Sequence, residues 1–183
     1  MSVAPLEPSL GPPRPGADDH APYYGVYVRQ VPDGDVLETL ARQVGSTVAL
    51  LTPLDETQAA YRYAPGKWSV KEVLGHVIDV ERVFAQRALH FARNDAAPLP
   101  SMEQDGWVKT GYFDRRTLAS LLEEFSAVRQ ASLAMFHGFD SEAWVNSGSA
   151  SGVGFTAGSI PYIIAGHELH HRKVLEARYL SSL

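Results

Sequence analysis

Apolar residues recur at the spacing of one helix face in four long stretches, and this periodicity limits the possible folds more than any other feature of the sequence. The stretches cover about residues 36–51, 70–94, 118–137 and 160–179. In each, apolar side chains fall on one stripe, as in helices that bury one side. No segment reads convincingly as a strand. The pattern therefore predicts an all-α protein, built as a four-helix bundle.

Short polar residues that can cap a helix precede each stretch. The expected caps are Asp33 or Asp35, Ser69, Asp114, and Thr156 or Ser159. The second helix is the best defined of the four, because Glu72 follows Ser69 by three positions and completes a capping box. The last helix should continue to about Tyr179.

The segments between and before these helices differ in character. Residues 1–22 hold six of the 12 prolines and should form a tail that packs little on its own. Residues 23–183 form the single domain that we expect, and tyrosines 23, 24 and 27 lead into it and cover one of its faces. Residues 146–154 read as a Gly- and Ser-rich loop. Residues 95–113 form a loop that is long enough to cover a site.

Composition limits the chemistry that is available. The absence of cysteine excludes disulfides and thiolate ligands, so any metal site must use His, Asp, Glu or water. The net charge is −5 and the charges are mixed along the chain, which offers no basic face for nucleic acid. No apolar stretch approaches membrane-spanning length, and no secretory signal is visible. We therefore expect a cytoplasmic protein with no nucleic-acid or membrane partner.

Three of the seven histidines lie close together in the fourth helix. His167 and His171 are four residues apart, so both side chains project from one face and can reach one metal ion. On a helical wheel this face is the apolar, inward one, whereas His170 lies at its margin and Glu168 points away. Two buried imidazoles are costly unless their nitrogens have partners. A metal would supply them, but a hydrogen-bonded pair at a helix end is an equally open interpretation.

A third ligand has to come from another helix, and His76 is the natural candidate. It lies on the flank of the apolar stripe of the second helix, so a histidine at a helix seam without metal is an alternative. Gly75 beside it would let another element approach closely. Glu81 lies on the inward stripe, and it is a rival ligand or a catalytic base beside the metal.

Two segments, residues 67–76 (KWSVKEVLGH) and 163–171 (IIAGHELHH), resemble the DinB/YfiT-like superfamily, and most of all its DinB-2 branch. The resemblance covers about residues 33–180. It implies an up-down-down-up four-helix bundle, often dimeric. It also implies one divalent metal, nickel, zinc or iron, held by three histidines, which here are His76, His167 and His171.

Relatives in that superfamily include thiol S-transferases, a thiol-dependent isomerase, and proteins described as metal-dependent hydrolases. The resemblance therefore implies an enzyme whose metal has an open position that activates a low-molecular-weight thiol or water for a small-molecule substrate. Trp107 could contact the substrate, and Arg87 could hold an anionic thiol cosubstrate. The alternative is a non-catalytic, metal-binding homodimer of a bacterial stress or DNA-damage response.

Overall fold

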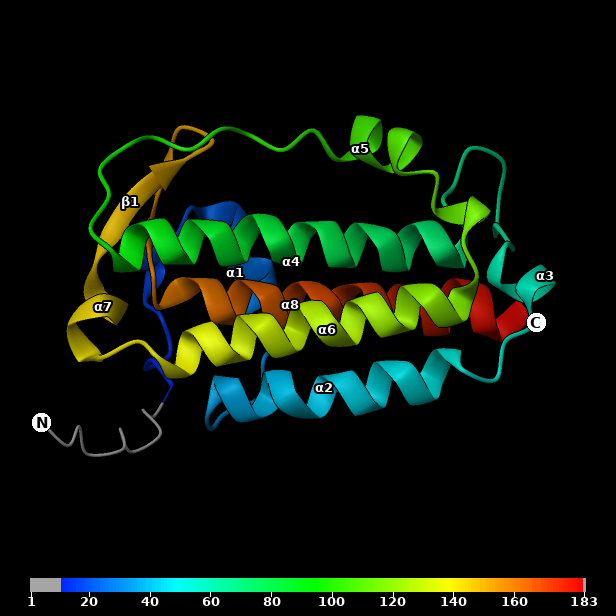
Figure 1. Cartoon of the computed structure of the whole chain (residues 1–183), viewed down its shortest axis with the longest axis horizontal. Coiled ribbons are helices and arrows are strands. Elements are labelled where there is room, and N and C mark those ends of the chain that lie inside the picture. Colours follow the sequence, from blue (N-terminus) through cyan, green and yellow to red (C-terminus); the bar gives the residue numbers. More distant parts are fainter. Residues whose placement is uncertain (1–10, 183) are drawn as a thin grey trace, which may run out of the picture.

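Four long helices form the body of the protein, whose computed structural model describes residues 11–182 (Figure 1). They are α2 (Val36–Leu51), α4 (Val70–Ala92), α6 (Leu118–His137) and α8 (Ser159–Val174). A π-helical turn, η4 (Leu175–Tyr179), extends α8. The predicted four-helix bundle is confirmed. Within the described part of the chain, no helix is both long and apolar enough to cross a membrane.

The helices follow the up-down-down-up order that the resemblance implied. In Figure 1, α2 and α8 run in one direction, and α4 and α6 run in the other. α4 and α6 are neighbours. A helix of 23 residues is about 35 Å long. The chain must therefore travel back along the whole bundle between the end of α4 and the start of α6, and residues 93–117 make this crossover.

The crossover is not the plain loop that the sequence predicted. It contains the helix α5 (Gln104–Gly111) and the 3-10 turn η3 (Phe113–Arg115). α5 begins where the Glu103 side chain accepts hydrogen bonds from the backbone N–H groups of Asp105 and Gly106. This acidic cap is the signal that the prediction overlooked.

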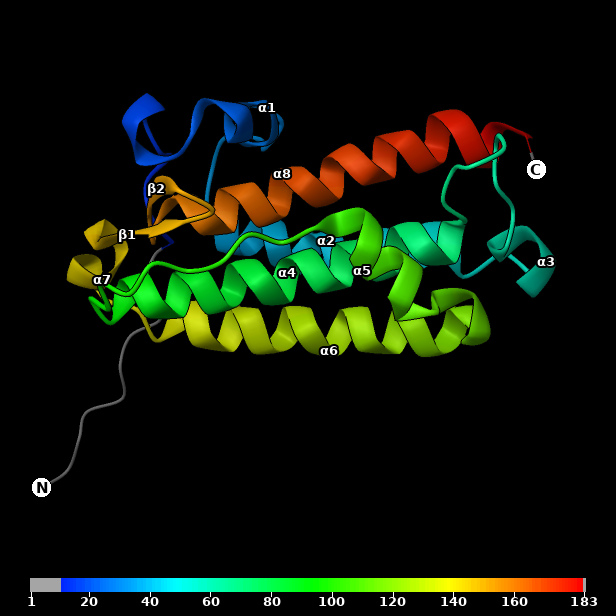
Figure 2. The same cartoon turned by 90° about the horizontal axis from the view of Figure 1, so that it is seen from above.

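Smaller elements lie at the two ends of the bundle and along one face. They are η1 (Ala17–Asp19), η2 (Pro22–Tyr24), α1 (Gly25–Val28), α3 (Glu56–Ala59), α7 (Ser141–Val145), η5 (Leu180–Ser182) and the strands β1 (Ser147–Ala150) and β2 (Val153–Thr156). The aromatic lead-in behaves as predicted, since α1 packs against α8 and covers one face of the bundle (Figure 2).

The two strands correct the prediction of a loop at residues 146–154. They pair antiparallel, with Ser147 opposite Thr156 and Ala150 opposite Val153. Ser151 and Gly152 both have positive φ, which suits a tight two-residue hairpin turn. Gly and Ser have low strand propensity, so the pairing depends on tertiary contacts. Leu99 of the crossover supplies two of these through backbone hydrogen bonds with residues 149 and 151.

The caps of the first two long helices agree with the sequence, and the caps of the last two do not. Asp35 caps α2, and Ser69 forms the expected capping box with Glu72. Thr117, not Asp114, caps α6, because Asp114 instead accepts a hydrogen bond from the Ser69 hydroxyl. α8 starts after Gly158 and has no side-chain cap.

Part of the proline-rich segment is held on the bundle, and residues 1–10 of it lie outside the described residues. Arg14 donates hydrogen bonds to the carbonyl oxygens of Val28, Val31 and Pro32. The Tyr162 hydroxyl donates to the Pro12 carbonyl. The described part therefore packs more closely than the composition predicted.

The core consists of two apolar clusters, one toward each end of the bundle. Between them, a layer of buried polar side chains crosses all four long helices. It is formed by Gln43, Thr47, His76, Glu81, Arg129, Ser132, His167 and Glu168. Buried polar groups need partners, so this layer is where a functional site is expected.

Candidate metal centre

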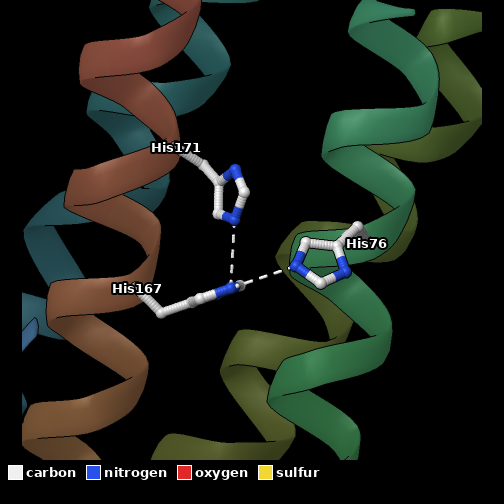
Figure 3. Close-up of side chains that lie close together, drawn as sticks. All are labelled: His76, His167 and His171. Atoms are coloured by element: carbon white, nitrogen blue, oxygen red, sulfur yellow. Dashed lines mark hydrogen bonds between the residues drawn. The ribbon is translucent and has the colours of Figure 1, made fainter. Parts of the chain in front are cut away.

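α8 places two histidines one above the other on the face that looks toward α4. His167 and His171 are four residues apart, and their Nε2 atoms lie 3.1 Å from each other (Figure 3). α8 can lie this deep because Gly166 lets the backbone of α1 approach it. A Cβ atom at Gly166 would lie only 2.1 Å from the Tyr27 carbonyl oxygen.

α4 contributes the third histidine from across the bundle. His76 is buried, and its Nε2 lies 3.1 Å from Nε2 of His167 (Figure 3). Gly75 plays the role that the sequence predicted, since the ring of Phe113 occupies the space that a Cβ atom would need. The indole of Trp68 packs against His76, with its ring centre 4.8 Å from that of the imidazole. Packing thus fixes the position of His76.

Hydrogen bonds between the three neutral imidazoles cannot satisfy all of their close nitrogen–nitrogen contacts. Nε2 of His167 faces Nε2 of both His76 and His171. A neutral imidazole nitrogen has either one hydrogen or one lone pair in the ring plane, so it can satisfy only one of these neighbours. One cation between the three nitrogens would satisfy all of them.

The spacing agrees with such a cation. Metal–nitrogen bonds of about 2.1 Å in tetrahedral geometry place ligand nitrogens about 3.4 Å apart. The observed contacts of 3.1 Å are close to this value, and all three ligand atoms lie within 4.8 Å of one another. The residues present therefore fit a divalent metal, and this cluster is the one predicted from the sequence.

Burial keeps these imidazoles neutral, which is the form that binds metals. Desolvation lowers the pKa of His76 to about 4 and that of His171 to about 3. It also lowers the pKa of His167, and the neighbouring histidines add to this effect. Since a protonated imidazole has no free lone pair, the low pKa values favour metal binding down to acidic pH.

The comparisons with known proteins bear on this site and on the fold. A family model of the DinB superfamily matches residues 39–175, which include all three histidines. The chain belongs to the DinB superfamily. Among solved structures it is similar to YfiT from Bacillus subtilis, with a TM-score of 0.67 and 12% sequence identity over 92% of this chain and 94% of that one. No curated protein sequence matches the chain.

YfiT is described as a probable metal-dependent hydrolase with an unusual four-helix bundle topology. At this identity, the likeness establishes that the two proteins share a fold. The membership of this chain in the DinB superfamily rests on the match to the family model, and the case for a metal rests on the geometry of its own histidines.

In this DinB-superfamily bundle, Glu81 points inward as predicted, but its carboxylate contacts Arg129. Both carboxylate oxygens of Glu81 accept hydrogen bonds from Arg129, at 2.8 and 2.9 Å. Glu81 is not part of the cluster of possible metal ligands among the described residues. Its role as a base or ligand therefore has no support, and we leave it out of the proposed chemistry.

Glu168 also departs from the expectation that it points away from the core. It is 1% exposed, and it accepts hydrogen bonds from Arg129 at 2.7 Å and from the Thr47 hydroxyl at 2.6 Å. α8 is buried on two sides, so its polar residues face either the histidine cluster or α2 and α6.

The sequence analysis did not identify Arg129, although this residue lies on the apolar stripe of its helix, about 40° from Phe125.

Two cavities flank the histidine cluster. The first, of about 220 Å³, is lined by His76 and His167 together with Tyr23, Tyr24, Tyr27, Val80, Val83, Phe84, Arg87, Met102, Gln104, Ser151 and Ile163. The second, of about 370 Å³, adjoins His170 and His171 and includes Lys67, Trp68 and Asp105. α5 and the residues before it contribute to both, so the crossover walls the site as predicted.

The other residues that the sequence singled out differ in whether they line one of these cavities. Arg87 is buried and lines the first cavity. Trp107 is 44% exposed on α5 and lines neither of these two cavities, so the structure does not support a contact with substrate. His170 packs its ring against Tyr27, whose role the sequence did not reveal. Tyr27 also covers His167, at 5.4 Å between ring centres.

Proposed function

We propose that this DinB-superfamily protein is a metal-dependent enzyme that transfers the sulfur of a small thiol to an electrophilic substrate. One divalent metal is held by His76, His167 and His171. The observation that carries the proposal is that three histidine side chains converge on one point, and two of them, His76 and His167, line a cavity. Three protein ligands are typical of catalytic sites, in which a further coordination position stays open.

The donor set narrows the choice of metal. Three neutral imidazoles without a carboxylate or thiolate suit zinc, nickel or iron. Such a metal, when bound, lowers the pKa of a thiol or water molecule at its open position. The histidines hold it, the aromatic rings of Tyr24, Tyr27 and Phe84 exclude bulk water from the first cavity, and Met102 of the crossover closes one wall.

A thiol is favoured over water as the nucleophile, because the described lining of the first cavity contains no carboxylate. No Asp or Glu is among the described residues that line it, so it offers no carboxylate base for water. A thiol is more acidic and needs less help to lose its proton. The chain has no cysteine, so the thiol must arrive as a cosubstrate. Its sulfur would bond to the electrophilic carbon, the leaving group would depart from that carbon, and the thiol proton would go to solvent.

Hydrolysis is the second candidate, and Asp105 is the observation that favours it. This carboxylate lines the second cavity next to His171 and could accept a proton from water there. An Asp105→Asn variant separates the two functions. It should abolish a hydrolase activity, whereas it should leave thiol transfer through the first cavity largely intact.

Metal content is the first test of the proposal. Elemental analysis of the purified protein should show close to one divalent metal per chain, and His167→Ala should lose it. His170→Ala is the matched control, because this histidine lies on the same helix outside the ligand cluster and should keep the metal. Unchanged metal in His167→Ala would refute the site.

Turnover is the second test. The metal-loaded protein is incubated with low-molecular-weight thiols and 1-chloro-2,4-dinitrobenzene, and thioether formation is followed by absorbance. Activity that disappears in His167→Ala and persists in His170→Ala supports thiol transfer. Full metal occupancy without turnover across a broad panel of thiols and esters would instead favour a non-catalytic metal-binding protein. Light scattering in the same experiments tests the homodimer that the family resemblance implies.

A further inference from the structure

The first cavity contains a positive charge as well as histidines. Arg87 is 3% exposed, yet it lines the same cavity as His76 and His167. Its Nη2 atom donates hydrogen bonds to the Pro100 carbonyl at 3.0 Å and to the Ser151 hydroxyl at 3.1 Å. Both acceptors are neutral. No described Asp or Glu forms an ion pair with Arg87, so the guanidinium charge is buried without a counter-charge.

The other deeply buried arginine shows how unusual this is. Arg129 is 0% exposed and pairs with two carboxylates, those of Glu81 and Glu168. A buried cation normally has such a partner, because desolvation costs several kcal/mol per ion. Arg87 is one of the residues that line the first cavity. The missing anion therefore fits a ligand that enters this cavity.

The distance between Arg87 and the histidine cluster determines how long a ligand must be to reach both. At about 1.5 Å per residue, the Cα atoms of His76 and Arg87 are about 16 Å apart. The Arg87 side chain leans back toward His76, because its Cζ atom lies 4.8 Å from the ring centre of Phe84. The distance between the histidine cluster and the guanidinium is thus on the order of 10 Å.

The part of the wall that α4 and α8 supply between these two ends is apolar. Val80, Phe84 and Ile163 line it, and the ring of Tyr24 packs edge-on against Phe84 at 5.6 Å. A ligand that fills the cavity would therefore be apolar in its middle.

We infer that Arg87 is the anion-binding group of the substrate pocket. The site would take a small, elongated molecule with a carboxylate or similar anionic group at one end, an apolar middle, and its reacting group at the histidine end. The assignment of the histidine end rests on the proposed function. The anionic end rests on the burial and contacts of Arg87 alone. A guanidinium suits this role because it can donate two parallel hydrogen bonds to a carboxylate.

The competing explanation is structural. Arg87 ties the crossover to the hairpin turn through Pro100 and Ser151, and this alone could account for its burial. The two explanations differ in ligand selectivity. A structural arginine affects the affinity for charged and neutral ligands equally, whereas an anion-binding arginine affects only the charged one.

The test uses 4-phenylbutyrate and the neutral 4-phenyl-1-butanol as probes of matched shape. Calorimetric titration of the metal-free protein measures the Kd of each. We expect the wild type to bind the carboxylate about tenfold more tightly than the alcohol, in line with a charge-assisted hydrogen bond. Arg87→Gln should reduce this ratio to about one without changing the Kd of the alcohol.

Two further variants keep the result interpretable. Ser151→Ala removes one of the structural hydrogen bonds of Arg87 but keeps its charge, so it should retain the tenfold preference. Arg87→Lys keeps a positive charge if Arg87→Gln does not fold, and it should retain a reduced preference. A preference that survives in Arg87→Gln, or a wild type that binds both probes equally or neither, would overturn the inference.

A second arm separates this inference from the proposed function. The zinc-loaded protein is titrated with 6-mercaptohexanoate and with 6-mercapto-1-hexanol. If the thiols bind with no dependence on zinc or on His167 while the carboxylate preference of Arg87 is intact, the proposed function fails and the anion site stands. If both thiols bind to the zinc protein with equal Kd in the wild type and in Arg87→Gln, the anion site fails.

Discussion

Two buried polar groups lie side by side in the middle layer of this bundle, and they are built in opposite ways. The Arg129 group joins all four long helices, and its charges are matched by Glu81 and Glu168. The histidine cluster joins only α4 and α8, and the Nε2 of His167 faces two neighbours that it cannot both satisfy. Adjacent residues on α8, His167 and Glu168, belong to the two different groups.

The difference teaches how to separate structure from function in a buried polar layer. A group whose hydrogen bonds are complete within the chain has no need of a ligand, and its role is to fix the arrangement of the helices. A group with incomplete hydrogen bonds beside a cavity is more stable when something else binds. The predictions below test this distinction, from the largest expected effect to the smallest.

Removal of the charge at the centre of the complete group should have the largest effect. Arg129→Met leaves the carboxylates of Glu81 and Glu168 buried and unpaired. We expect the free energy of unfolding, measured by urea denaturation, to fall by about 3–5 kcal/mol. Arg172→Met is the control, because the ion pair of Arg172 is with half-exposed Glu176 and its loss should cost less than about 1 kcal/mol. Equal losses in the two variants would contradict a structural role for the network.

The incomplete group should respond to metal instead. At free zinc of 100 times Kd, the wild type should gain about 2.7 kcal/mol in unfolding free energy. His76→Ala should gain almost nothing, because the α4 ligand is lost. His90→Ala, on the same helix outside the cluster, should gain as much as the wild type. Thermal denaturation with and without zinc measures this, and equal gains in His76→Ala and wild type would rule out His76 as a ligand.

The close approach of α1 to α8 supports the histidine side of the layer. In Gly166→Ala the new methyl group collides with the Tyr27 carbonyl oxygen, and we expect a loss of about 2 kcal/mol together with weaker zinc binding. Gly45→Ala on α2 is the matched control. A Cβ atom there has no neighbour within 4 Å, so the protein should become slightly more stable. A harmless Gly166→Ala would show that α1 does not position His167.

The pH dependence of the metal-free protein is the smallest expected effect. The pKa of His171 is about 3 in the folded protein, against about 6.5 when unfolded. Below pH 6.5 the unfolded chain binds a proton that the folded chain does not, so stability falls as the pH falls from 6.5 toward 3. Between pH 7.5 and 5.5, His171→Gln should lose about 1 kcal/mol less than the wild type. Parallel urea curves at the two pH values would detect this, and identical losses would disprove the buried neutral state.

The fold was largely accessible from the sequence because each long helix carries its own local signal. The Ser69 capping box and the apolar stripes locate their helices without reference to the rest of the chain. The hairpin was not accessible in this way, whereas α5 was overlooked although Glu103 supplies a local capping signal. β1, with the sequence Ser-Gly-Ser-Ala, has low strand propensity, and its pairing is supported by Leu99, which is far from it in sequence.

The site was only partly accessible, for a related reason. The spacing of His167 and His171 is a local property of one helix, so geometry alone selected the pair. His76 depended on the family resemblance, because its place on the wheel was ambiguous. The wheel could not decide the role of Glu81, because it shows that a side chain points inward but does not show what it meets there. Arg129 comes from another helix and occupies both of its oxygens.

The parallel arrangement of α4 and α6 has a consequence for how such proteins can diversify. A chain with this topology must send a long return segment over its own flank, and here that segment supplies Met102 and Gln104 to the first cavity and Asp105 to the second. Changes in the return segment can reshape either chamber without disturbing the helices that carry the histidines. Substrate selection and metal retention can therefore evolve on separate stretches of one polypeptide.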